Sequence, residues 1–278
     1  MTYDANFKQL LPDFLSGCEI RANEPVGKLP LEIDLVITCP SASRDGITIP
    51  VFNTHFASIN IIEHKSSHVA PSKNDIAKLS GYVSLYCARN DISIDVIEST
   101  VAAWYIVASR PDFIDGLVAK EVISKSSTNG LYRLAISFLC PCYMLVIDEL
   151  DRVEGNYPLL GFGSDGIMAE TVVTMDDLHH RHALSPALEN YLKSICYLNY
   201  KVLSTMTETK EIVANALKKN LKDIIDTVGV EAMKENLKEI IDMVGTEAVI
   251  DVIGAEKLEH MLAQRKTPAR TKKKGKKN

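Results

Sequence analysis

The pattern of apolar and polar residues over the first 150 positions alternates between helical and extended spacing. Near the N-terminus, Asp4 stands at a candidate N-cap and Pro12 at an expected kink. Residues 31–37 alternate at first and are then wholly apolar, as in a strand that enters a buried sheet. Residues 58–63 predict a second strand, and residues 47–52 a third between them. The apolar residues at helical spacing near the N-terminus are Phe7, Leu10, Leu11, Phe14 and Leu15.

A helix and three further strands are expected after residue 72. Ser72 and Asp75 have the spacing of a capping box. Residues 101–108 are a continuous apolar run of strand length, which predicts a buried strand parallel to an earlier one. Residues 131–139 and 143–147 predict two more strands. This order of elements indicates an α/β fold. The apolar face of the expected helix consists of Ile76, Leu79, Val83, Tyr86 and Cys87.

The second half of the chain has a different pattern. Glycines mark loops between residues 151 and 207, and residues 185–206 have helical spacing. Residues 220–235 (NLKDIIDTVGVEAMKE) and 236–251 (NLKEIIDMVGTEAVID) form an internal repeat with ten of sixteen positions identical. Each apolar stripe ends at a glycine, which suits a helix C-terminus. Such short amphipathic helices are expected to pack on each other, on the core or on another subunit, so they offer a surface for a homo-oligomer.

The chain therefore divides into four expected parts. Residues 1–150 form an α/β core, 151–207 a loop and helical extension, 208–264 a set of amphipathic helical repeats, and 265–278 a disordered basic tail. The expected fold is a mixed sheet flanked by helices, with the short-helix repeats as an appendage.

Charge is concentrated in the basic tail, which reads RKTPARTKKKGKKN and has eight basic residues and no acidic one. The whole chain has 31 basic and 36 acidic residues, so the rest retains 23 basic residues against 36 acidic ones, a formal charge of −13. Mobile Lys and Arg contact phosphates without fixed geometry, so the tail indicates DNA as a partner. A solubilising tail without a partner is the alternative. The candidate DNA-binding residues of the tail are Lys272, Lys273 and Lys274.

Composition narrows the class of protein. No run of about 18 apolar residues is present and the N-terminus lacks a signal-peptide layout, so no membrane partner is expected. Six scattered cysteines favour reduced thiols in a cytoplasmic protein over a disulfide framework. No glycine-rich phosphate loop follows a strand, so no nucleotide cofactor is expected.

The residues best suited to chemistry lie in the run IIEHKSSH at positions 61–68. In a strand, Glu63 and Lys65 point to one face and His64 to the other. Two charges at the end of an apolar strand are costly unless the strand emerges into a site. Phosphodiester cleavage uses such a pair, because a carboxylate holds a divalent cation and an ammonium offsets charge in the transition state. Asp34, in a preceding strand, would complete the metal site.

Three segments together resemble the PD-(D/E)xK nuclease superfamily, and within it the recombination-promoting nuclease and PD-(D/E)xK nuclease-family transposase group. They are YDANFK at 3–8, EID at 32–34 and IEHKSS at 62–67. The resemblance covers residues 3–104 and implies a restriction-endonuclease-like fold with DNA cleavage that depends on Mg²⁺ or Mn²⁺, linked to recombination or mobile elements.

The resemblance also assigns roles. It implies that Asp34 and Glu63 bind the metal together with the backbone carbonyl of His64, that Asp4 is a further candidate ligand, and that Lys65 is the catalytic lysine.

Two features depart from the superfamily pattern. Asp34 is not preceded by proline, and the segment between Asp34 and Glu63 is long and is expected to form a hairpin. Some nucleases of this superfamily carry a Gln-x-x-x-Tyr element on the following helix. Lys78 and Tyr82 stand at the similar place here, so they are candidate substrate-binding residues.

Structural alternatives exist for the charged candidates. Asp34 could instead pair with Lys28 or Arg21 at the strand end. Glu63 and Lys65 could form an exposed pair on an edge strand.

The remaining candidates have alternatives too. Asp4 could be only an N-cap, Glu32 could supply a carboxylate or merely flank Asp34, and His64 could be a packed core histidine. The HHRH run at 179–182 could suggest zinc, but a polar surface turn is the better interpretation. The thiols of Cys140 and Cys142 lack a second pair for structural zinc.

Three functions remain open on this evidence. The first is a Mg²⁺-dependent DNA endonuclease. The second is a catalytically inactive nucleic-acid-binding or regulatory protein on a nuclease-like fold. The third is an assembly component built around the C-terminal repeats.

Overall fold

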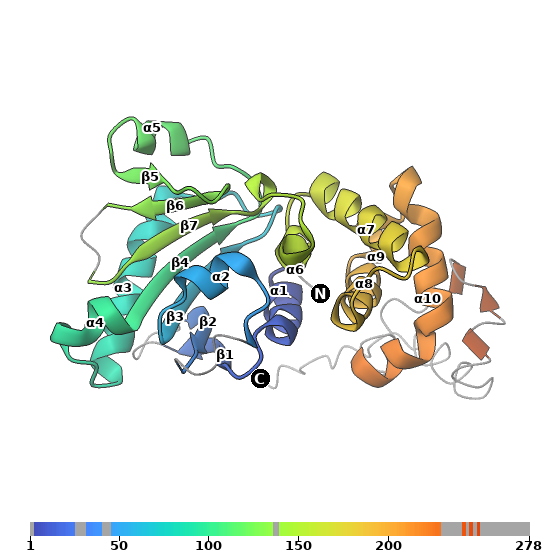
Figure 1. The fold of residues 1–278 in the computed structure, drawn as a ribbon, viewed down its shortest axis with the longest axis horizontal. Coiled ribbons are helices and arrows are strands. Elements are labelled where there is room, and N and C mark those ends of the chain that lie inside the picture. Colours follow the sequence, from blue (N-terminus) through green and yellow to red (C-terminus); the bar gives the residue numbers. More distant parts are fainter. Residues whose placement is uncertain are drawn as a thin grey trace, which may run out of the picture.

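The protein is built around a seven-stranded mixed sheet with helices on both faces (Figure 1). A computed structural model describes residues 3–25, 32–40, 46–135 and 139–228, and the short stretches 241–242, 245–246 and 249–250. The strands are β1 (Glu19–Pro25), β2 (Glu32–Thr38), β3 (Ile59–Lys65), β4 (Val101–Val107), β5 (Ile123–Lys125), β6 (Leu131–Leu134) and β7 (Cys142–Val146).

The strand order in the sheet is β1-β2-β3-β4-β7-β6-β5. The central strands β3, β4 and β7 are parallel, and the outer pairs on both sides are antiparallel. The predicted α/β class with a mixed sheet flanked by helices is confirmed. Among the described residues, the helices with more than four residues are α1 (Tyr3–Leu10), α2 (Pro50–His55), α3 (Lys73–Arg89), α4 (Ile94–Thr100), α5 (Ile114–Val118), α7 (Asp165–His180), α8 (Pro186–Leu198) and α10 (Thr207–Val228).

The centre of the sheet is buried from both sides. All seven residues of β4 are buried, and β4 pairs in parallel with β3, so the prediction from its continuous apolar run is confirmed. Alternate residues of β4 enter two different cores. Trp104 packs into the core covered by α1, α2 and the helices of the second half, and Tyr105 packs into the core covered by α3.

Helix α3 connects β3 to β4 and covers one face of the sheet. Its predicted capping box is present, because the Asp75 carboxylate accepts a hydrogen bond from the Ser72 backbone N–H at 2.9 Å. The predicted apolar face is buried against the sheet. A helix between two adjacent parallel strands brings both strand ends to the same edge of the sheet.

The segment between β2 and β3 differs from the sequence expectation. The predicted strand at 47–52 is wrong: Ile47 makes only an isolated bridge with Leu15, and helix α2 begins at Pro50. Proline fits the first position of a helix because its missing N–H needs no partner there. The expected hairpin is therefore replaced in part by a helix. Residues 41–45 lie outside the described residues.

Two short or polar strands were not predicted. The edge strand β1 is mostly polar and carries Asn23 with a φ of 53°, which interrupts any alternation. Strand β5 has three residues, too few for a periodic signal.

The helices α7, α8 and α10 form a group beside the sheet (Figure 1). The predicted helix at 185–206 is confirmed, but it is interrupted at Asn199 between α8 and the short α9 (Tyr200–Leu203). The first repeat copy begins within the last turns of α10, which ends at Val228. The side chains of that copy, most of the second copy, and the basic tail with its Lys272, Lys273 and Lys274 lie outside the described residues.

Helix α1 packs against the helical group. The Asn6 side-chain amide donates a hydrogen bond to Asn199 Oδ1 at 3.2 Å, in a buried position. The Phe7 ring meets the Phe162 ring edge-on with centroids 5.1 Å apart, and Phe14 meets Tyr191 edge-on at 5.3 Å. Among the described helices, none is long and apolar enough to cross a membrane.

A disulfide links Cys18 to Cys39, so the expectation of reduced thiols throughout is wrong. The reason is the register of the β1–β2 pair, which places Glu19 opposite Thr38 and leaves the neighbouring cysteines with Cα atoms 4.4 Å apart. The other cysteines are free and buried: Cys87, Cys140, Cys142 and Cys196.

Candidate active site

Asp34 lies where the ladder between β2 and β3 ends. The register of these strands stops at the pair Leu35 and Ile62. Beyond it, the Asp34 carboxylate takes the place of a strand carbonyl, because Oδ2 accepts the backbone N–H of His64 at 2.9 Å. This hydrogen bond fixes the carboxylate at the point where the two strands separate.

Glu63 and Lys65 lie next to each other on the α3 face of β3. The Lys65 ammonium donates to Glu63 Oε1 at 2.6 Å, and Glu63 is buried. Strand β3 lies between β2 and β4, so the alternative of an exposed pair on an edge strand is wrong. The period of two in a strand places these two charges together, as the sequence predicted.

The two carboxylates lie close enough to influence each other. Burial raises the pKa of Glu63, and the negative charge of Asp34 raises it further. Burial by itself acts to lower the pKa of Lys65, but its hydrogen bond to Glu63 and the surrounding negative charges outweigh this, so the pKa is raised. Lys65 is therefore held as an ammonium.

Lys8 on α1 is a second lysine of the site, to which the sequence analysis gave no role. Its ammonium contacts Asp34 Oδ1 at 2.6 Å and donates to Asn23 Oδ1 at 2.9 Å. The alternative partner Arg21 instead forms ion pairs with glutamates, and Lys28 lies outside the described residues. The only signal in the sequence was the presence of Lys8 in the run YDANFK.

Helix α3 contributes a third carboxylate beside Lys65. Asp75 accepts hydrogen bonds from Ser72, and its Oδ1 lies 3.5 Å from the Lys78 ammonium. Tyr82 is partly buried against the core on the α3 face, where burial raises its pKa and the charge of Glu63 raises it further. Lys78 lies one turn before Tyr82 with 61% of its side chain exposed, available to solvent and to a ligand.

The remaining candidates are less central. The His64 ring is buried and stacked on Phe7 with centroids 4.0 Å apart, as expected of a packed core histidine. Glu32 is exposed at the start of β2. Asp4 lies within the first turn of α1 and not before it, and its side chain is outside the described residues. The role of the His64 carbonyl stays a prediction.

The donor set fits a hard divalent cation. Asp34 and Glu63 offer carboxylate oxygens, and Asp34 Oδ2 accepts the backbone N–H of the residue that follows Glu63, so the two acidic residues lie in one region. No group of three or more His, Cys, Asp or Glu side chains that could hold a metal exists in the part of the chain that the structure describes. Mg²⁺ is bound by one or two carboxylates together with water, so two carboxylates are sufficient for it.

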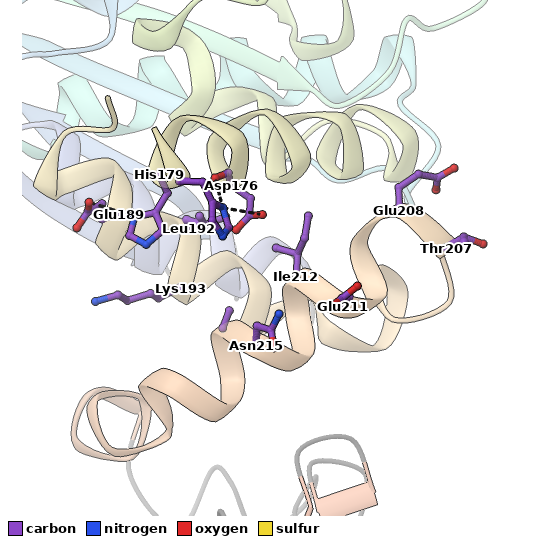
Figure 2. Close-up of a pocket in the computed structure, with 12 residues that line it drawn as sticks. Asp176, His179, Glu189, Leu192, Lys193, Thr207, Glu208, Glu211, Ile212 and Asn215 are labelled. Carbon is purple, nitrogen blue, oxygen red and sulfur yellow. Dashed lines mark hydrogen bonds and ion pairs between the residues drawn. The ribbon is translucent and has the colours of Figure 1, made fainter. Parts of the chain in front are cut away.

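A separate pocket of about 370 Å³ lies between α7, α8 and α10 (Figure 2). His179 contacts Glu189 at 3.1 Å and His180 contacts Asp176 at 3.4 Å, so both rings pair with carboxylates. His179 and His180 are the last two residues of helix α7, so the expected surface turn begins only after His180. The sequence interpretation is wrong for these two histidines.

Comparison with known proteins gives no match: no family model, no curated protein and no solved structure is significantly similar to the chain.

Proposed function

We propose that this chain is a DNA endonuclease that depends on Mg²⁺ or Mn²⁺ and uses Asp34, Glu63 and Lys65 as its catalytic residues. The observation that carries the proposal is the meeting of two carboxylates and an ammonium at the point where β2 and β3 separate. The parallel pair β3–β4 with α3 between them agrees with a restriction-endonuclease-like fold.

Each residue has a distinct task in this proposal. Asp34 and Glu63 would hold the cation, with the His64 carbonyl as a further oxygen ligand. The cation would neutralise phosphate charge and lower the pKa of a bound water. Lys65 would act as a charged donor and not as a base, because its contact with the Glu63 carboxylate favours the ammonium form. As an ammonium it would orient the attacking water and offset the negative charge that grows on the phosphate.

DNA would approach along the edge of the sheet where the site lies. Lys78 and Tyr82 stand on the α3 side of that edge and would contact the sugar-phosphate backbone. The basic tail would add contacts that do not depend on sequence, with Lys272, Lys273 and Lys274 among them.

Plasmid nicking in Mg²⁺ tests the proposal. Glu63→Gln and Lys65→Met should each lower the rate about 100-fold or more, the scale on which a single transition-state contact acts. Glu98→Gln and Lys120→Met are matched controls, since both residues are exposed and away from the site, and they should cleave like the wild type. Equal nicking by all five proteins would show that the activity comes from elsewhere.

A second function is favoured by one observation. Both carboxylates are already paired with lysines, as in a site that holds its geometry without a metal. A binding or regulatory protein on the same fold would bind DNA in a gel-shift assay and never nick it, with or without Mg²⁺.

A further inference from the structure

The Lys8 side chain links two strands of the sheet, and its contacts with Asp34 and Asn23 are called the clasp below. Its ammonium reaches Asp34 on β2 and Asn23 on β1 at the same time, at 2.6 and 2.9 Å. Only 14% of the Lys8 side chain and 17% of the Asp34 side chain are exposed. An ion pair so little exposed is screened less by salt and water than a surface pair.

The backbone of Asn23 is shaped around this clasp. The β1–β2 register pairs Ala22 with Leu35 and Glu24 with Ile33, so Asn23 stands opposite Asp34. Asn23 itself is left out of the ladder and has a φ of 53°, in the left-handed region that is unfavourable for a non-glycine residue. Asparagine tolerates this conformation better than most residues, and here it places its side-chain oxygen on the Lys8 ammonium.

The clasp also changes the charge balance of the site. Asp34 and Glu63 carry two negative charges, and Lys8 and Lys65 carry two positive ones. The neighbouring Asp75 and Lys78 form an ion pair of their own, so these groups sum to zero without a cation. A divalent cation would leave them with a charge of +2. Each phosphodiester of a nucleic acid carries one negative charge, so a bound phosphodiester would offset half of this excess.

Both oxygens of Asp34 are already engaged, Oδ2 by the His64 N–H and Oδ1 by Lys8. A cation that binds Asp34 must therefore share the carboxylate with an ammonium of like charge. We propose that Lys8 makes cation binding depend on nucleic-acid binding: the free protein holds the metal weakly, and a bound phosphodiester strengthens it. This inference rests on the proposed function, since it concerns the same site.

Mn²⁺ titration of the full chain by calorimetry tests the inference without any cleavage. Lys8→Met should bind Mn²⁺ about tenfold tighter than the wild type, because removing the ammonium removes the repulsion. Lys8→Arg keeps the charge and should bind like the wild type. Lys120→Met is the matched control and should have no effect, because its side chain is exposed and away from the site.

The second half of the experiment adds a short DNA duplex with phosphorothioate linkages. The wild type should then gain more Mn²⁺ affinity than Lys8→Met does. Asn23→Ala removes one contact of Lys8 but keeps its ammonium, so this variant should retain the gain in Mn²⁺ affinity. It is the control for a structural effect: if Asn23→Ala also lost the gain, disruption of the local structure and not loss of the charge would explain the result.

The outcomes separate the two proposals. Equal Mn²⁺ affinities of wild type and Lys8→Met, both abolished by Asp34→Asn, would overturn the role of Lys8 and leave the nuclease proposal standing. Weaker binding by Lys8→Met would also overturn it, because Lys8 would then merely position Asp34. Absence of Mn²⁺ binding in every variant, with and without DNA, would overturn both.

Discussion

The Asp75 carboxylate accepts three hydrogen bonds at the start of α3. Asp75→Ala should therefore lower the free energy of unfolding by about 2–4 kcal/mol. Its Oδ2 accepts from the Ser72 backbone N–H at 2.9 Å, from the Ser72 hydroxyl at 2.8 Å and from the Tyr105 hydroxyl at 3.3 Å. Loss of the capping contacts costs about 1 kcal/mol. Tyr105 is 0% exposed, and an unsatisfied buried hydroxyl costs about 1–3 kcal/mol more.

Urea unfolding followed by tryptophan fluorescence measures this loss. The chain has a single tryptophan, the fully buried Trp104, so the signal reports the core directly. In a chain of this size each kcal/mol lowers Tm by about 2–4 °C, so a loss of roughly 5–15 °C is expected.

A double-mutant cycle with Tyr105→Phe isolates the buried hydroxyl. In the Tyr105→Phe background, the loss of unfolding free energy caused by Asp75→Ala should be smaller by at least about 1 kcal/mol. The reason is that no hydroxyl is then left without a partner. Strictly additive costs, or a loss below about 0.5 kcal/mol for Asp75→Ala alone, would refute the reasoning.

Three further predictions concern acid, thiols and the disulfide. Burial acts to raise the pKa of Asp75, but its hydrogen bonds with Ser72 outweigh this and hold the pKa below the usual 3.8. Its contribution to stability is thus complete above that pH and lost as the pH falls through the folded-state pKa, so Asp75→Asn should flatten the acid loss in unfolding titrations. Burial raises the pKa of Cys140 and of Cys196 to about 12, so both should resist iodoacetamide at pH 8 until urea unfolds the chain, as read by mass spectrometry. Reduction of the disulfide between Cys18 and Cys39, which are 21 residues apart, should cost about 3 kcal/mol and lower Tm, whereas rapid reduction with unchanged Tm would contradict this.

The part of the fold that the sequence predicts best is the run from β3 to β4. Strand β4 is apolar throughout, and β3 has the buried apolar pair Ile61 and Ile62 before its charged end. The helix has both a capping box and a single apolar face, so local preference and burial agree. Strand β1 gave no such signal, because its residues are mostly polar and it is held by pairing with β2 and by the disulfide. Its position depends on a partner that the local pattern does not contain.

The candidate site divides in the same way. The contact between Glu63 and Lys65 follows from the period of a strand, so it could be predicted. The contact between Lys8 and Asp34 joins residues 26 positions apart and depends on how α1 packs beside the sheet. No local pattern contains that information, which is why Lys8 was missed.

The packing of α1 has a consequence for any attempt to transplant the site. The buried Asn6–Asn199 hydrogen bond and the edge contact of Phe7 attach this helix to residues after position 150, and Phe14 in the following turn adds an edge contact. A chain cut at residue 150 would keep β2, β3 and α3 but would expose the inner side of α1 to water. The N-terminal half is therefore not expected to keep the site when it is moved to another protein. The Lys8 ammonium stays beside Asp34 only while the second half holds α1 in place.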